Sequence, residues 1–129
     1  MVVTSYQYPQ YLYAFNSNEE AVQLPNGSWS NPANGWELKA ACREETNGKG
    51  STIQTANGKT IVFASLIQLP KGTARINEGT EILVTREEVE PDKLLEPDFI
   101  EAAKISGLVI AKGVCEKYDY GRLHCRLWI

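Results

Sequence analysis

Residues 121–129 alternate strictly between two kinds of side chain, which limits the end of the chain to one kind of element. The apolar positions are Leu123, Cys125, Leu127 and Ile129, and the intervening positions are Arg122, His124, Arg126 and Trp128. Successive side chains of a β-strand point to opposite faces, so a period of two predicts a strand with one face on a core. We expect this strand to close the fold.

The second face of that strand has two interpretations. Arginine and tryptophan are favoured at protein–protein contacts, which predicts a contact surface, but the domain itself could also cover both faces. Trp29, in a loop dense in turn formers, likewise fits either a docking residue or packing over an open barrel end. The candidate interface residues are Trp29, Arg122, His124, Arg126 and Trp128.

Turn signals divide the rest of the chain into short segments. Four Asn-Gly pairs occur, and this pair readily adopts the positive φ that tight turns need. Runs rich in β-branched and aromatic residues lie between the turns, and 129 residues suffice for one domain, 1–129. The sequence predicts a mostly β fold of about seven strands with long loops and one short helix, either a small antiparallel β-barrel or a sandwich of two sheets.

The predicted strands follow from these runs. One begins after Pro9 in the aromatic N-terminal segment, residues 1–20; the others are 21–24, 36–45, 51–56, 59–69, 80–86, 107–116 and 121–129, with a turn at 118–121. Asn57-Gly58 predicts a two-residue hairpin, and the strand 36–45 is expected to turn Trp36, Leu38, Ala40 and Cys42 inward. Residues 59–69 are apolar on both faces, which fits a central strand or a strand against a partner subunit.

An acidic insertion, residues 87–106, interrupts the β pattern. Proline at a helix-start position, followed by acidic residues, predicts a helix of about two turns over 97–104. The predicted core consists of Trp36, Leu38, Ala40, Ile61, Phe63, Ile67, Ile82, Val84, Leu108, Ile110, Leu123 and Leu127.

Charge and cysteine usage favour a cytoplasmic protein. The net charge of −3 gives no basic excess for nucleic-acid binding, no apolar run reaches bilayer length, and the N-terminus lacks a secretory pattern. Cys42, Cys115 and Cys125 are expected to be buried free thiols in a reducing compartment, although a bridge between Cys115 and Cys125 is conceivable.

Catalytic chemistry has little support in the sequence. His124 is the only histidine, and Cys125 beside it would point to the opposite face of a strand. We therefore expect no enzyme activity, cofactor, metal or small-molecule substrate. The N-terminal aromatics could stack bases, but packing in a core or interface is preferred because a basic groove is missing.

The order of several short motifs resembles one protein family. A loop with Gly27 and Trp29 precedes Trp36; a strand then ends in Ala-Cys-Arg-Glu-Glu at 41–45 and is followed by an Asn-Gly hairpin. Residues 76–84 form an Ile-x-x-Gly-x-x-Ile-x-Val corner, and the strands at 107–114 and 123–127 close the series. From about residue 22 to 129, with 87–106 as an insertion, this is similar to the head-closure (head–tail joining, or stopper) proteins of tailed phages and prophages.

The resemblance implies a structural role in virion assembly. Such proteins are small β-barrels that self-associate into a ring between the portal–adaptor complex and the tail, so the expected partners are portal, adaptor and tail proteins. The expected location is the host cytoplasm and then the virion. The alternatives are a small β-barrel binding module for a ligand or an oligonucleotide, or an uncharacterised small enzyme. A deep polar pocket with shifted pKa values would favour an enzyme or ligand site, and salt-sensitive binding of single strands would favour the oligonucleotide.

Overall fold

The computed structural model describes residues 4–17, 25–27, 34–55 and 57–129. Within these ranges it contains nine strands, one α-helix and one 3₁₀ helix. The strands are β1 (Gln10–Ser17), β2 (Asn34–Thr46), β3 (Thr52–Gln54), β4 (Thr60–Val62), β5 (Ser65–Pro70), β6 (Glu81–Thr85), β7 (Val109–Val114), β8 (Lys117–Tyr120) and β9 (His124–Trp128). The helices are η1 (Pro91–Leu95) and α1 (Phe99–Ser106). The candidate strand at 21–24 lies outside the described residues.

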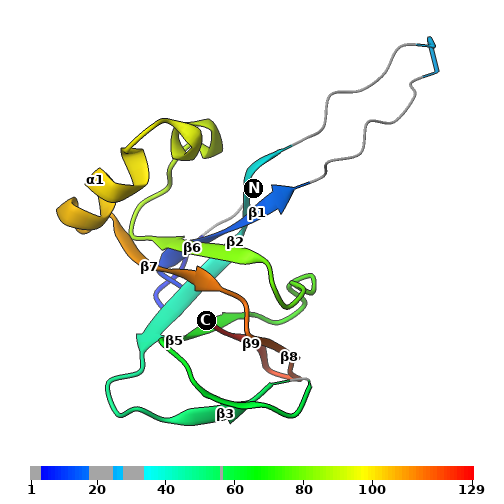
Figure 1. Cartoon of the computed structure of the whole chain (residues 1–129), viewed down its shortest axis with the longest axis vertical. Helices are drawn as coiled ribbons and strands as arrows, with labels where there is room; N and C mark the ends of the chain where they lie inside the picture. Colours follow the sequence, from blue (N-terminus) through cyan, green and yellow to red (C-terminus); the bar gives the residue numbers. More distant parts are fainter. Residues whose placement is uncertain (1–3, 18–24, 28–33, 56) are drawn as a thin grey trace.

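Seven strands form one antiparallel sheet in the order β7-β6-β1-β2-β5-β9-β8, and β3 pairs with β4 separately. This confirms the mostly β, antiparallel class, but the sheet is open rather than a closed barrel. Its two edge strands, β7 and β8, are joined by residues 115 and 116 alone. The Cys115 N–H bonds to Thr80 O at one end of the sheet, and the Glu116 N–H bonds to Trp128 O at the other. The sheet therefore curls until its two ends meet at this link (Figure 1).

A bulge in β2 divides the apolar side chains between the two faces of the sheet. Leu12 pairs with Ala40 but Tyr13 pairs with Leu38, so Lys39 is the extra residue. Consequently Trp36 and Leu38 pack on the opposite face from Ala40 and Cys42. The expectation of one inward face along this strand is wrong, because the bulge reverses the alternation.

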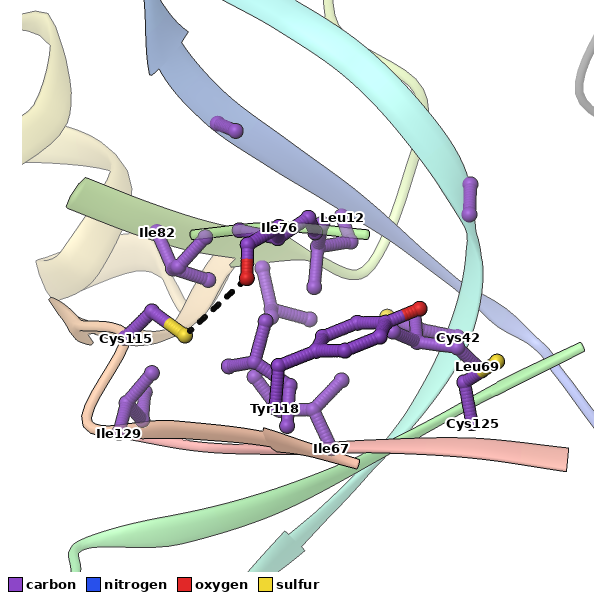
Figure 2. Packing of buried hydrophobic residues seen from close by; sticks show 14 residues of the cluster. Leu12, Cys42, Ile67, Leu69, Ile76, Ile82, Cys115, Tyr118, Cys125 and Ile129 are labelled. Carbon is purple, nitrogen blue, oxygen red and sulfur yellow. Dashed lines mark hydrogen bonds between the residues drawn. The ribbon is translucent and has the colours of Figure 1, made fainter. Parts of the chain in front are cut away.

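The first core cluster fills the inside of the curled sheet (Figure 2). Leu12, Ile67, Ile82 and Leu127 are fully buried there, and Tyr118 lies among them. The Tyr118 hydroxyl, at 3.0 Å, and the Cys125 thiol, at 3.9 Å, both donate to the carbonyl of Thr73. The cluster is thus tied to the turn that follows β5.

The second cluster lies on the outer face of β7, β6, β1 and β2, where η1 and α1 cover it. Tyr13, Trp36 and Leu83 of the sheet meet Leu94 and Ala103 of the helical segment. The aromatic N-terminal strand is therefore part of the core, and the acidic insertion covers the second cluster. The predicted helix is confirmed but begins two residues after Pro97, with Asp98 as its N-cap and Gly107 at its C-cap.

Three sequence predictions around the hairpins need correction. The run 59–69 breaks between β4 and β5, so Phe63 is only partly buried. The Thr55 N–H bonds to Lys59 O, which leaves three residues rather than two in the hairpin loop. Residues 117–120, predicted in part as a turn, form β8, because they pair with β9.

The predicted core is only partly reproduced. Six of its members are buried: Trp36, Ala40, Ile67, Ile82, Val84 and Leu127. Five others are half-buried: Leu38, Ile61, Phe63, Leu108 and Ile110. Leu123 is exposed, because it lies in the turn before β9 and outside the alternating strand.

Candidate interaction surface

An open pocket with a volume of about 880 Å³ lies where the β8–β9 turn meets the end of β5. We call it the basic pocket. Its lining consists of Lys71, Tyr120, Gly121, Arg122, Leu123, His124 and Arg126. It brings together three of the predicted interface residues, Arg122, His124 and Arg126.

The backbone of the β8–β9 turn depends on Gly121. A Cβ on this residue would lie 2.3 Å from the carbonyl oxygen of His124, which is closer than any real contact. Glycine therefore allows the chain to reverse tightly between Tyr120 and Cys125, which pair across the two strands. The turn holds Arg122 and Leu123 at its tip.

Lys71 reaches the pocket from the turn that follows β5. Pro70 pairs with His124 at the end of the β5–β9 ladder, so the next residue lies beside the β8–β9 turn. The N–H and hydroxyl of Thr73 both donate to the carbonyl of Pro70, at 3.2 and 2.6 Å, and close a turn around Lys71. Gly72 takes the positive φ of 85° that this turn requires.

The cations of the pocket differ in how they are engaged. Arg126 makes an ion pair of 2.5 Å with Asp119, and its guanidinium lies 5.4 Å from the centre of the Trp128 ring. Lys71 and Arg122 are exposed and have no ion-pair partner among the described residues. Two positive charges are therefore available to an anionic group from another molecule.

Two exposed apolar side chains accompany these charges. Tyr120 is 60% exposed and Leu123 is 84% exposed, and both line the pocket. Sequence reasoning missed Lys71, Tyr120 and Leu123 as site residues. The Lys71-Gly72 and Tyr120-Gly121 pairs mark turns, but only the antiparallel pairing of β5, β9 and β8 shows that these turns are neighbours.

The structure places Trp128 differently from the sequence prediction. It is only 7% exposed, in the middle of three strands, where it pairs with Leu66 and Lys117. Lys117 Nζ, 5.5 Å from the ring centre, and Arg126 flank its ring. Of the two interpretations of this strand face, coverage by the domain itself holds for Trp128, because neighbouring cationic side chains cover its ring. Trp29 lies outside the described residues.

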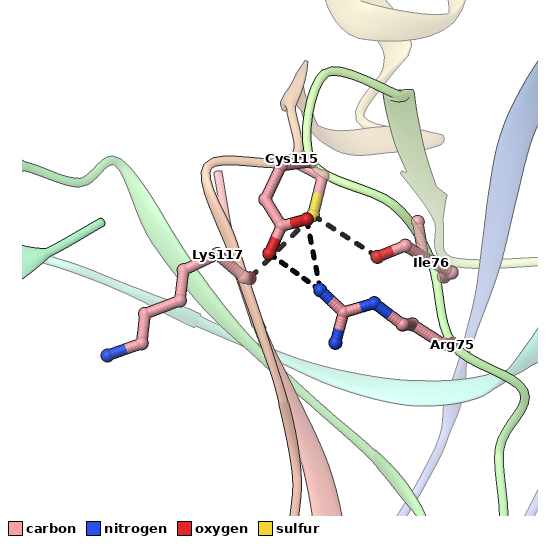
Figure 3. Close-up of polar contacts among 5 residues, drawn as sticks. Arg75, Ile76, Cys115 and Lys117 are labelled. Carbon is pink, nitrogen blue, oxygen red and sulfur yellow. Dashed lines mark hydrogen bonds and ion pairs between the residues drawn. The ribbon is translucent and has the colours of Figure 1, made fainter. Parts of the chain in front are cut away.

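A second polar cluster joins the 75–79 loop to the link between the two sheet edges (Figure 3). Arg75 donates to both carboxylate oxygens of Glu78, at 2.9 and 3.0 Å. The N–H of Glu78 itself, followed by Arg75, lowers the pKa of that carboxyl. The Cys115 thiol contacts the carbonyls of Ile76 and Lys117. These contacts fasten the loop to the link.

The cysteines are free and buried, as predicted from the sequence. Burial, with the charge of Glu78 as the next cause, raises the pKa of Cys115 to about 12. Burial also raises the pKa of Cys42 strongly. These two thiols therefore stay protonated near neutral pH and are poor nucleophiles.

Among the described residues, no group of three or more His, Cys, Asp or Glu side chains could hold a metal ion. In the same ranges, no helix has the length and apolar character to cross a membrane. Comparisons with protein-family models, curated proteins and solved structures give no match for this chain.

Proposed function

We propose that this chain is a non-enzymatic assembly subunit of the head-closure kind, which joins a ring between a phage portal–adaptor complex and the tail. The observation that carries the proposal is the basic pocket. It combines the exposed apolar side chains Tyr120 and Leu123 with Lys71 and Arg122, which have no ion-pair partner within the described part of the chain. A surface that keeps this combination accessible is suited to bind another protein.

The organisation of the domain supports a structural role. The inner cluster packs against β5, β8 and β9, so the β8–β9 turn projects from a firm base. The Cys42 and Cys115 thiols are held protonated by burial. Such a domain presents a fixed contact surface. On this proposal the protein is made in the host cytoplasm and ends in the virion.

On this proposal the genes on either side of this chain's gene should encode portal, adaptor and tail proteins, and the test uses those proteins. Electron microscopy of the portal–adaptor complex should show an added ring of density when wild-type protein is mixed with it. Arg122→Glu should abolish the ring, whereas Lys49→Glu, an equal charge reversal at the exposed 47–50 turn, should leave it intact. Absence of binding by the wild type, or equal binding by Arg122→Glu, would overturn the proposal.

One observation favours a second candidate, a binding module for single-stranded oligonucleotides. The pocket combines Lys71, Arg122 and Arg126 with the exposed ring of Tyr120, and such proteins bind through cations and stacked aromatics. This candidate requires tight binding of a short single strand that weakens steeply with salt. The net charge of −3 opposes it, because the rest of the surface repels phosphates.

A further inference from the structure

The basic pocket has a counterpart on the same chain. Residues 87–101 carry seven carboxylate side chains and one lysine, and all seven acids are exposed. These acids are Glu87, Glu88, Glu90, Asp92, Glu96, Asp98 and Glu101. Leu95, 51% exposed, lies between Asp92 and Glu96 in the sequence. We call this surface the acidic ridge.

The two surfaces are complementary in both charge and apolar content. The pocket offers Lys71 and Arg122 beside Tyr120 and Leu123, and the ridge offers carboxylates beside Leu95. Opposite charges steer two surfaces together and fix their register, while apolar side chains between them gain from losing water. The ridge therefore has the negative charge and the exposed apolar side chain that a partner of the pocket needs.

The ridge of one molecule does not reach its own pocket. Figure 1 shows η1 and α1 on the far side of the molecule from β8 and β9. The ridge is also fastened to the sheet, because the Tyr13 hydroxyl bonds to Val89 and Leu94 is buried under η1. A contact between ridge and pocket therefore has to join two copies.

We propose that the occupant of the basic pocket is the acidic ridge of a second copy of this chain. The inference rests on the proposed function, in which the pocket is a protein contact, and it names the partner. A contact between two different surfaces repeats head to tail, so it closes into a ring or continues as a filament. Each copy then uses both surfaces once.

The experiment is sedimentation velocity of the full chain over a wide range of concentration, at low and high salt. The pocket variant is Lys71→Glu/Arg122→Glu, the ridge variant is Glu88→Lys/Glu90→Lys, and the matched control is Lys49→Glu. Wild type and control should self-associate, and association should weaken with salt because the charges are exposed. Each double variant alone should associate at least about tenfold more weakly, because like charges then face each other.

Mixing the two double variants provides the decisive measurement. The acidic ridge of the pocket variant suits the unchanged pocket of the ridge variant, and the reversed ridge suits the reversed pocket. The mixture should therefore associate more strongly than either variant does alone. Thermal unfolding checks that each variant folds. If the pocket variant does not fold, Lys71→Gln/Arg122→Gln takes its place in the experiment.

Two results would overturn this inference. One is a wild type that stays monomeric throughout, with a mixture that also does not associate. The other is salt-sensitive binding of a short single-stranded oligonucleotide that the pocket variant loses while self-association is unchanged. Because binding to the portal–adaptor complex is measured separately, the inference can fail while the proposed function survives.

Discussion

The Tyr13 hydroxyl donates a hydrogen bond to the carbonyl of Val89 and accepts one from the N–H of the same residue, each at 2.7 Å. This pair joins the centre of β1 to the segment between β6 and η1. It satisfies both backbone groups of a buried residue, which would otherwise be costly to bury. The acidic segment is therefore fixed to the sheet by a specific polar contact as well as by apolar packing.

Tyr13→Phe removes the hydroxyl and leaves both backbone groups of Val89 without this partner. We expect a loss of about 1–3 kcal/mol in the free energy of unfolding, measured by urea denaturation. Tyr6→Phe is the control, because Tyr6 is fully exposed and its change should be close to zero. Equal stability of Tyr13→Phe and wild type would mean that water replaces the hydroxyl.

Trp128→Ala tests the corrected position of this indole. Because Trp128 is buried between β5 and β8, the substitution should destabilise the isolated domain by roughly 3 kcal/mol. Arg122→Glu, at the exposed turn, should change the unfolding free energy by less than about 0.5 kcal/mol. A stable Trp128→Ala variant that fails to assemble would instead make the indole a contact residue.

The sequence predicted which segments form strands and helices better than it predicted which face of the sheet each side chain occupies. The alternation after His124 and the Asn-Gly turns indicated an antiparallel β fold, and Pro97 with its acidic neighbours indicated the helix. Alternation alone did not reveal the bulge at Lys39, because a bulge depends on the pairing partner in β1. One extra residue was enough to send Trp36 and Cys42 to different cores.

Only the residues of the basic pocket that are close together in the sequence could be predicted, because strand pairing brings in the others. Arg122, His124 and Arg126 share a local pattern that can be found along the sequence. Lys71 is distant from them in sequence and joins them only through the pairing of β5 with β9. The sequence also could not show that Lys117, from the neighbouring strand, covers Trp128.

Ile67→Ala tests the position of the inner core. Ile67 is fully buried on the interior strand β5, so its truncation should cost about 2–5 kcal/mol in the free energy of unfolding. Val62→Ala is the control from β4, because Val62 is 65% exposed and its loss should cost less than about 0.5 kcal/mol. Similar costs for the two variants would contradict the break at residues 63–64.

Alkaline pH should destabilise the protein through its buried thiols. An unfolded thiol titrates near 9.0, whereas the pKa of Cys115 rises to about 12 in the folded state through burial. Between these values the unfolded chain has lost a proton that the folded chain keeps, so the unfolding free energy falls as pH rises. Below pH 9 this contribution is fully present.

Cys115→Ala isolates this effect. Urea denaturation between pH 8 and 10 should show a shallower decline for the variant than for wild type, even if its stability at pH 8 is lower. Burial also raises the pKa of Tyr13 and Tyr118, so a decline above pH 10 should persist in both proteins. If the unfolding free energy of wild type and of Cys115→Ala fell equally with pH below pH 10, the Cys115 thiol would ionise in the folded state.

Gly121→Ala tests the turn that builds the basic pocket. The new Cβ would meet the carbonyl oxygen of His124 at 2.3 Å, and a backbone atom in a strand pair cannot yield cheaply. We expect the β8–β9 turn to shift, the unfolding free energy to fall by about 1–3 kcal/mol, and self-association to weaken. Gly48→Ala is the control, because its Cβ would meet nothing within 4 Å and its φ is not positive. The control should fold and associate as wild type does. If Gly121→Ala matched it in both stability and self-association, the tight turn would not be what positions Arg122 and Leu123 for binding.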